Sequence, residues 1–317
     1  MKNANKQKSK ANLIFIVVVC AILTLYAISI CIPLVWGLMT SLKSFLDFDL
    51  HSNVVGLPNP KYSGNEIKLA NYALILSKFN FTKRVPFYIG NKLVVHSTKV
   101  TVLQSLLNTI LYSSIACVLL AVVPAIVAYI CAKYNYKFMR FLYGYVVVTM
   151  IIPLVGTYAS ELTLLRGLGL YDTTIGFILQ KLSFSGMYFL VFHAFFHSLP
   201  DTYMEAAQID GASHFTILSR IALPMARKII FSVMLIQFII YWNDYQMAIM
   251  YMPTHPTLSY AIYHMTLESS SGEFAEYAKI VPVKVAGAML LAIPILIIYV
   301  LLKDKIIGNM SLGGIKG

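Results

Sequence analysis

The chain of 317 residues is 58% hydrophobic and only 12% charged, with a mean hydropathy of +0.73. A soluble domain of this size carries roughly 25% charged residues, so the composition excludes a soluble globular protein and indicates a helical integral membrane protein. The net charge of +12 does not indicate nucleic-acid binding, because the basic residues stand at the ends of apolar segments and in one loop, as membrane topology requires.

Six apolar segments are long enough to cross a bilayer, which needs about 20 helical residues. The first follows a charged start and is too long for the apolar part of a signal peptide. Glycines and Asp172 separate the third segment from the fourth. The sequence therefore predicts a single all-α membrane domain over 1–317 with six transmembrane helices, near 12–39, 104–132, 140–161, 174–197, 224–250 and 281–302.

The distribution of charge between these segments predicts their orientation, because positively charged residues accumulate in cytoplasmic loops. Basic residues cluster before the first segment and after the second, fourth and sixth: Lys2, Lys6, Lys8, Lys10, Lys133, Lys137, Arg140, Arg220, Arg227, Lys228, Lys303 and Lys305. Acidic residues cluster after the third and fifth segments: Glu161, Asp172, Glu268, Glu273 and Glu276. We therefore expect both termini to lie in the cytoplasm.

The loop at 40–100 falls outside the cell in this arrangement, although it is rich in lysine. Long loops are exported largely regardless of their charge, so this loop carries little weight for the orientation. The stretch "GLPNPKYSGN" is typical of turns and "FYIGNKLVVH" is typical of a strand. We expect a small folded external element here and not a disordered linker.

No catalytic constellation can be assembled from the sequence, and the phosphate-binding pattern Gly-x-x-x-x-Gly-Lys-Ser/Thr is missing. His193 and His197 lie one helical turn apart, but they lack a third ligand, so two packed or interfacial histidines are a better interpretation than a metal site. Asp244 is the only carboxylate well inside a span, which is a thin basis for a proton relay. We expect a protein that is not an enzyme, binds no metal or cofactor, and relies on a partner for any uphill transport.

The stretch 199–224, "LPDTYMEAAQIDGASHFTILSRIALP", breaks the apolar pattern between the fourth and fifth segments. Asp201 or Thr202 can cap a new helix, and Thr202 with Glu205 has the spacing of a capping box. The sequence therefore predicts a short helix that begins at the cytoplasmic end of the fourth segment.

The end of this helix is also marked in the sequence. Gly211 can adopt the left-handed conformation that stops a helix, a second short helix follows, and Pro224 suits the first turn of the next span. Ala206 and Ala207 make one side thin enough for another protein to approach, and Glu205 can pair with a cation on that protein. This arrangement is a mechanical coupler; the alternative is an amphipathic helix resting on lipid headgroups, which would favour a basic polar face.

The stretch closely resembles the Glu-Ala-Ala (EAA) motif of ABC-importer permeases. The matching residues are Glu205-Ala206-Ala207, Asp210-Gly211-Ala212 and Ile221-Ala222-Leu223-Pro224. Further segments resemble the same family along nearly the whole chain: "LANYALIL" at 69–76, "LLNTILYSS" at 106–114, "AYICAKYNY" at 128–136, "YWNDYQMAI" at 241–249 and "GGIKG" at 313–317. Together they are similar to the carbohydrate-uptake branch, in particular to the smaller permease of the maltose transporter.

The resemblance implies a multi-pass protein of the bacterial plasma membrane with a permease core at about 101–302 and a cytoplasmic coupling loop at 200–223. It implies half of a heterodimeric pore, with a second permease subunit, two ATPase subunits that bind ATP and Mg, and an external solute-binding protein. Glu205 to Gly211 would form the coupling helix in an ATPase cleft, with Ala212, Leu223 and Pro224 completing the motif. Gly313, Gly314 and Lys316 of the tail would reach the same ATPase interface.

Residues that touch the solute are less well marked. Trp242, Asn243 and Asp244 lie in or beside a span, where they face the pore or the partner permease, or else form interhelical hydrogen bonds with no substrate role. The stretch 251–280 would face outside and, by the resemblance, reach towards the binding protein. The expected solute is a carbohydrate, most simply an oligosaccharide; the alternatives are a non-sugar solute, a secondary carrier, or a membrane scaffold without transport.

Overall fold

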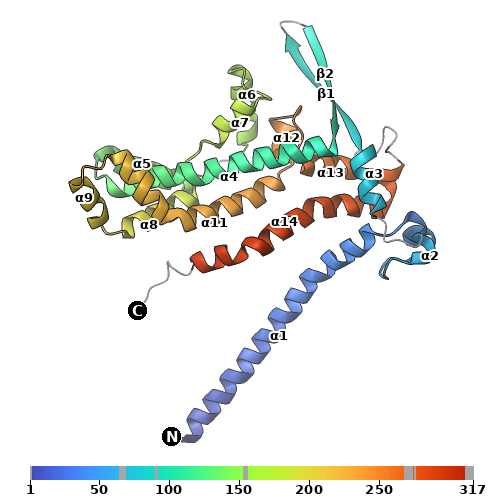
Figure 1. Cartoon of the computed structure of the whole chain (residues 1–317), viewed down its shortest axis with the longest axis horizontal. Coiled ribbons are helices and arrows are strands. Elements are labelled where there is room, and N and C mark those ends of the chain that lie inside the picture. Colours follow the sequence, from blue (N-terminus) through green and yellow to red (C-terminus); the bar gives the residue numbers. More distant parts are fainter. Residues whose placement is uncertain are drawn as a thin grey trace. The chain divides into compact units, whose positions relative to one another are not determined.

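A computed structural model describes residues 2–63, 69–89, 92–152, 156–267, 274 and 276–310, and this part of the chain is mostly helical (Figure 1). Four helical runs within it are long and apolar enough to cross a membrane: Leu13–Ser41, Val102–Lys133, His214–Trp242 and Val281–Lys303. Three of these runs belong to single helices: α1 (Lys2–Ser41), α4 (Val102–Lys133) and α14 (Val281–Met310). The run His214–Trp242 is continuous through α10 (His214–Ile217), the π-turn η2 (Leu218–Ala222) and α11 (Leu223–Trp242).

Three of the six predicted transmembrane segments are interrupted, so the six-helix count is not confirmed. The segment 140–161 is split into α5 (Lys137–Ile151) and α6 (Thr157–Gly167), 174–197 into α7 (Thr174–Lys181) and α8 (Met187–Ser198), and 224–250 into α11 and α12 (Gln246–Met250). Gly156 and Gly186 mark two of the breaks with φ of +78° and +133°, which residues with a side chain rarely adopt. The apolar pattern is weak at both breaks, because Ser160 and Glu161 follow the first and Ser183 and Ser185 precede the second.

The chain divides into two compact units, the first formed by 1–78 with 268–290 and the second by 79–267 with 291–317. In the first unit, α3 (Ala70–Lys78) is hydrogen-bonded to the end of α1: the Tyr72 hydroxyl lies 2.7 Å from Ser41 Oγ, and Asn71 Nδ2 donates to the carbonyls of Ser41 and Lys43. The other short elements of this unit are η1 (Leu46–Leu50), α2 (Pro60–Ser63) and η3 (Tyr277–Lys279).

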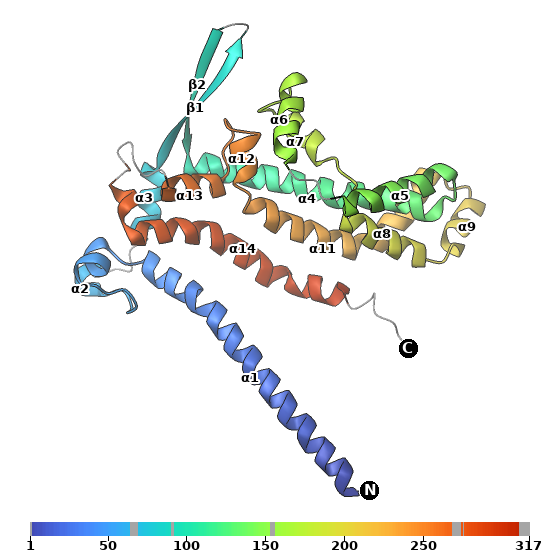
Figure 2. The ribbon, with the colours of Figure 1, turned by 180° about the vertical axis from the view of Figure 1, so that it is seen from behind.

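The second unit is built around α4, which lies side by side with α8 and α11 (Figures 1 and 2). The contact is between small residues on α4 and aromatic residues on α8: Ala121, Ala125, Ala128, Phe189, Phe192 and Phe196 are all buried. Alanines let the neighbouring backbone approach closely, as is usual where helices pack within a membrane. The unit also contains α9 (Thr202–Ile209) and α13 (Leu258–Leu267).

Two antiparallel strands precede α4, so strand structure is present as predicted, but the stretch 87–96 is divided between the two strands and is not one strand. β1 (Asn80–Ile89) pairs with β2 (Lys92–Thr101) in a register that runs from Asn80 opposite Thr101 to Ile89 opposite Lys92. The Thr101 hydroxyl then accepts a hydrogen bond from Gln104 N and caps α4. The described residues of 40–100, which leave out 64–68 and 90–91, are folded, but they are shared between the two units and do not form one element.

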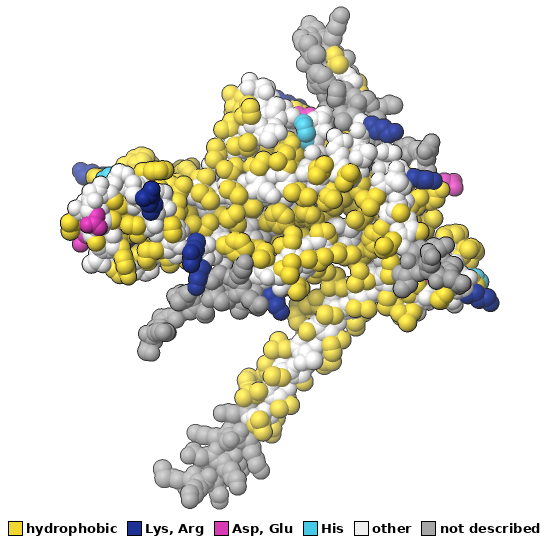
Figure 3. All heavy atoms as spheres, in the orientation of Figure 1, with side chains coloured by type: hydrophobic (Ala, Val, Ile, Leu, Met, Phe, Trp, Pro, Cys, Tyr) yellow, Lys and Arg dark blue, Asp and Glu magenta, His cyan; other side chains and the backbone are white. Residues whose placement is uncertain are grey.

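The surface of the described residues is dominated by apolar side chains, and the charged ones gather near the ends of the helices (Figure 3). Leucine, isoleucine and valine along α1 are more than half exposed at many positions, such as Leu13, Ile14 and Leu25. Exposed apolar surface on this scale is suited to lipid and not to water. The composition and the structure therefore agree on an integral membrane protein.

Candidate functional site

The polar stretch between α8 and α11 folds as a capped helical hook formed by residues 199–213. After α9, Gly211 adopts φ of +80°, its N–H donates to the Gln208 carbonyl at 3.0 Å, and Ala212 N–H donates to the Ala207 carbonyl at 2.9 Å. These two bonds are the Schellman motif, in which glycine is favoured because of its left-handed conformation. The predicted stop at Gly211 is confirmed.

The start of α9 differs from the capping box that the sequence predicted. Asp201, and not Thr202, is the residue that precedes the helix, and its side chain makes no capping hydrogen bond. Its Oδ1 atom instead accepts a hydrogen bond from Lys133 Nζ at 2.7 Å. A charge-assisted bond to an ammonium group is stronger than a cap on a neutral amide, which accounts for the difference.

The two sides of α9 have different surroundings. Met204 is buried, and Ala207 and Ala212 pack against the aromatic core between α4 and α8. On the opposite side Glu205, Ala206 and Asp210 are exposed, and Ile209 is 86% exposed. A carboxylate, a small side chain and a large apolar side chain therefore stand together on the outer face of the hook. Phe215, 76% exposed, adds a second apolar group at the start of α10.

Two side chains at the C-terminal end of α4 fasten the hook. Lys133 Nζ, besides its bond to Asp201, donates to the Leu199 carbonyl at 2.6 Å. The Tyr134 hydroxyl lies 2.8 Å from His214 Nδ1 on the other side of α9. A hollow of ≈ 400 Å³ opens beside this second link, lined by Tyr129, Ile130, Tyr134, Tyr136, Met139, His214, Phe215 and Leu218. The start of the hook is thus bonded to the last residue of α4, and the residue after the hook, His214, is linked to the residue after α4, Tyr134.

The ion pair also perturbs the titration of its acid. The hydrogen bond from Lys133 and the positive charge of Lys133 lower the pKa of Asp201. The side chain of Lys133 is only 8% exposed, whereas that of Asp201 is 72% exposed. Asp201 therefore remains charged well into the acidic range and keeps the buried ammonium group paired.

The second short helix predicted after Gly211 is not separate from the next span. Ser213 caps α10 by accepting a hydrogen bond from Thr216 N, and helical structure then continues to Trp242. Leu223 N donates to the Leu218 carbonyl, five residues back, in the π-turn η2. Pro224 has no N–H to offer the preceding turn, and a π-turn is a common way to accommodate such a gap. Leu223 and Pro224 thus belong to the helix and not to the loop.

The predicted pore residues receive different surroundings. Trp242 is 3% exposed and its Nε1 donates to the Leu291 carbonyl at 3.0 Å, so its side chain lies inside the unit. Asn243 is exposed and donates to the Ile239 carbonyl one turn back, whereas half-buried Asp244 accepts a hydrogen bond from Met247 N at the start of α12. Gly313, Gly314 and Lys316 lie outside the described residues.

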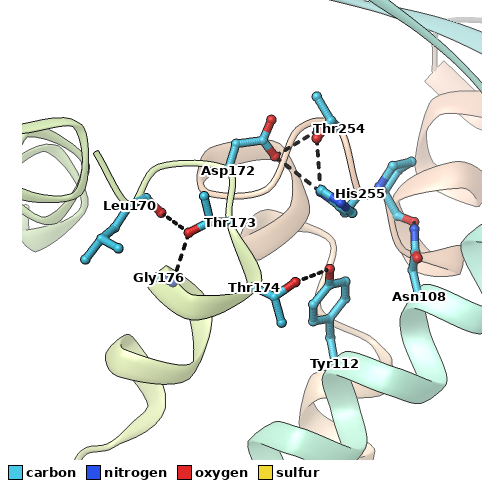
Figure 4. Close-up of polar contacts among 10 residues, drawn as sticks. Asn108, Tyr112, Leu170, Asp172, Thr173, Thr174, Gly176, Thr254 and His255 are labelled. Atoms are coloured by element: carbon cyan, nitrogen blue, oxygen red, sulfur yellow. Dashed lines mark hydrogen bonds and ion pairs between the residues drawn. The ribbon is translucent and has the colours of Figure 1, made fainter. Parts of the chain in front are cut away.

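A second polar cluster lies near the opposite end of α4 (Figure 4). Asp172, with φ of +60°, accepts a hydrogen bond from Thr254 N at 3.1 Å and lies 3.5 Å from His255 Nδ1. Asn108 donates to the Pro256 carbonyl at 3.1 Å, and the hydroxyls of Tyr112 and Thr174 lie 3.4 Å apart. These contacts join α4, the turn before α7 and the loop before α13.

Sequence reasoning missed this second cluster. It used Asp172 to separate the third segment from the fourth and as one of the charges that set the orientation. It could not pair Asp172 with His255, which lies 83 positions later in the chain. The signal that was present is the stretch of polar residues "YDTT" at 171–174 between two apolar segments. A local pattern of this kind marks a turn but does not identify the partner across the fold.

The chain resembles known transport proteins in sequence. The family described as "Binding-protein-dependent transport system inner membrane component" matches residues 121–308. The diacetylchitobiose uptake system permease protein NgcG of Streptomyces coelicolor is 25% identical over 297 residues, covering 92% of this chain and 86% of that protein. The trehalose transport system permease protein SugB of Mycobacterium tuberculosis is 26% identical over 215 residues, covering 68% of this chain and 77% of that protein.

Two further comparisons agree with these. The melibiose/raffinose/stachyose import permease protein MelC of Bacillus subtilis is 24% identical over 216 residues, covering 68% of this chain and 76% of that protein. A crystal structure of a bacterial ABC transporter involved in the import of the acidic polysaccharide alginate contains a chain of similar fold, with a TM-score of 0.68 and 21% identity over 93% of this chain and 97% of that chain.

Proposed function

Because the chain belongs to the family of inner-membrane components of binding-protein-dependent transport systems, we propose that it is a permease subunit of an ATP-driven importer and forms half of its translocation pore. The shared fold with a chain of an ABC importer supports this proposal. The importer would need further subunits. These are a second permease, a pair of ATPases that bind ATP and Mg, and an external solute-binding protein.

The hook 199–213 is the proposed contact with the ATPase. Its outer face offers Glu205 for a cation, Ala206 for close approach and Ile209 for an apolar pocket. Its inner face and the two fastenings to α4 make it rigid. Closure of the ATPase pair would then move α4 and α11 together and switch the pore between two states. The tail residues Gly314 and Lys316 are proposed as a second contact with the ATPase.

The proposed solute is a carbohydrate, most simply an oligosaccharide. Three similar permeases are named for trehalose, diacetylchitobiose and the melibiose/raffinose/stachyose group, which supports this class. A non-sugar solute handled by the same machine is the alternative within the family. A secondary carrier is disfavoured because the hook presents an acidic and apolar face suited to a partner protein.

The proposed topology has six crossings in a single permease domain over 1–317, with the type-1 core at about 101–302. α5 with α6, and α7 with α8, would supply the third and fourth crossings as interrupted helices, which membranes tolerate where the break lines a cavity or is buried in protein. Both termini and the coupling loop 200–223 would lie in the cytoplasm of a bacterial cell, and 40–100 would lie outside.

The experiment for this proposal reverses one charge on the hook. Glu205→Lys places a cation where we propose that an ATPase cation docks, so like charges would meet at the interface. We expect ATPase subunits to co-purify about tenfold less well, the size of effect that loss of one interfacial charge pair produces. Solute uptake by the reconstituted importer should fall with it.

The matched control is Glu276→Lys, which makes the same change at an exposed carboxylate far along the chain from the hook. This variant should retain both ATPase subunits, because it leaves the hook unchanged. Normal association and uptake in Glu205→Lys would contradict the proposed docking role.

A further inference from the structure

A carboxylate on α6 is held between two other elements of the second unit. Glu161 Oε2 accepts a hydrogen bond from Gln180 Nε2 on α7 at 2.9 Å and another from the Tyr251 hydroxyl, after α12, at 2.7 Å. In the sequence, Glu161 stands at the end of an apolar segment, and it was used there only as evidence for the orientation of the chain in the membrane. The structure instead makes it the centre of a polar group of side chains.

A cation lies next to Gln180 on α7. Lys181 Nζ is 4.7 Å from the ring centroid of Tyr241 and 5.5 Å from that of Phe177. Lys181 is only partly exposed. Ionisable side chains within a membrane domain are costly, and where they occur they usually serve a transport path or a ligand.

The position of this group within the fold also supports a role in solute binding or transport. α6 and α7 are the pieces of two predicted spans that the backbone interrupts, and α11 ends at Trp242, just before Asp244. Non-helical backbone at membrane depth is tolerated where it lines a cavity or is buried in protein. Discontinuous helices of this kind form solute sites in many transporters.

One atom and one ring of the group are suited to a ligand. Gln180 Oε1 is buried and has no hydrogen-bond partner among the described residues, although a buried acceptor is normally paired. The ring of Tyr158 is 52% exposed and its centroid lies 6.3 Å from that of Tyr251. An unpaired acceptor thus accompanies an open aromatic face.

We propose that this group contacts the transported carbohydrate inside the permease, through the side chains of Tyr158, Glu161, Gln180, Lys181 and Tyr241. Sugar hydroxyls donate to carboxylate and amide oxygens and accept from an ammonium group, while aromatic rings cover the apolar face of the sugar. The inference rests on the proposed function, because it presumes that a sugar passes through this subunit.

The first experiment asks whether a sugar touches the group. The complete importer, with its second permease, ATPases and binding protein, is assembled with a photoreactive benzoylphenylalanine at position 158 and illuminated during ATP hydrolysis. The probes are radiolabelled trehalose, melibiose and diacetylchitobiose. At least one probe should become attached to this chain, several times more than when the photoreactive group replaces Thr163 on another side of α6.

The second experiment asks whether the polar atoms matter for passage of the sugar. Glu161→Gln and Gln180→Leu should each lower probe uptake into proteoliposomes about tenfold, the effect of losing one good hydrogen bond. ATP hydrolysis stimulated by the loaded binding protein should persist, because neither side chain belongs to the hook. Ser160→Ala, a neighbouring exposed change on α6, should leave uptake unaltered.

The outcomes separate this inference from the proposed function. If no probe-loaded binding protein stimulates ATP hydrolysis by the unaltered importer, the carbohydrate function fails. If a probe is transported but neither labels position 158 nor responds to the two variants, the sugar contact is overturned. A loss of ATP hydrolysis together with uptake in both variants would also overturn it, since that result indicates a purely structural link between α6 and α7.

Discussion

At the scale of single residues, the fastening of the hook depends on one ammonium group, Lys133, and its acidic partner Asp201. Pairing lowers the pKa of Asp201 in the folded protein, so the stabilisation is present above the pKa of the unfolded carboxyl, about 3.9, and is lost as the pH falls through the lowered folded value. We predict that amide exchange in 202–209, corrected for its intrinsic rate, loses protection in this acidic range.

The matched variant for this prediction is Asp201→Asn, which retains the shape of the side chain but not the charge. Its protection should be lower than that of the unaltered protein at neutral pH and should not change with pH in the acidic range. Parallel profiles for the two proteins in hydrogen–deuterium exchange would mean that the ion pair does not hold the hook.

Residue-scale features differ in how far the sequence reveals them. Gly211 was predicted correctly because its role depends on the backbone conformation of one residue and its immediate neighbours. The capping box of Thr202 with Glu205 was wrong because Thr202 is already the first residue of α9. Asp201, the other predicted cap, precedes the helix but bonds instead to Lys133, 68 positions away. The local sequence suggests a hydrogen-bond partner for a capping side chain, but a charged side chain from another helix can bind that side chain more strongly.

At the scale of elements, the end of α9 gives a sharp prediction. A Cβ atom at position 211 would meet nothing within 4 Å, so only the backbone conformation of φ +80° resists a side chain. Gly211→Ala should therefore destabilise the folded unit by about 1–2 kcal/mol, the cost of a left-handed alanine. Gly144→Ala within α5 also meets nothing within 4 Å and should stabilise by up to about 1 kcal/mol through helix propensity.

Thermal unfolding in detergent measures both changes. The unfolding temperature should fall in Gly211→Ala and rise in Gly144→Ala. Unchanged stability in Gly211→Ala would contradict the requirement for a left-handed conformation at position 211. The pair also tests the structure of the hook without touching its outer face.

Helices were predicted well where an apolar pattern spans many residues, and poorly where a single turn of the backbone determines whether the helix continues. The runs at α1, α4 and α14 are continuous apolar stretches, so their length alone predicts the helices. The breaks at Gly156 and Gly186 were missed because the prediction joined apolar stretches across polar residues: Ser160 and Glu161 after the first break, and Ser183 and Ser185 before the second. The interrupted segments are also the ones that bring Glu161 and Gln180 together, so the missed breaks and the missed polar group have the same cause.

At the scale of the whole molecule, α4 separates the two regions that function requires. It has 32 residues, hence a length of about 48 Å, which exceeds the bilayer core of about 30 Å. The hook is tied to its C-terminal end through Lys133, and the strand pair precedes its N-terminal end. The proposed ATPase contact and the proposed external region therefore lie at opposite ends of α4.

This geometry predicts opposite accessibility for two exposed positions that flank α4, Lys99 and Asn135. In a background without the four native cysteines, Lys99→Cys should react with a membrane-impermeant maleimide added to intact cells or spheroplasts. Asn135→Cys should react only in inverted vesicles, because the basic residues that follow α4 favour the cytoplasmic side. Labelling of both cysteines from the same side would mean that α4 does not cross the membrane, and both the topology and the transmission of force from the hook would then be wrong.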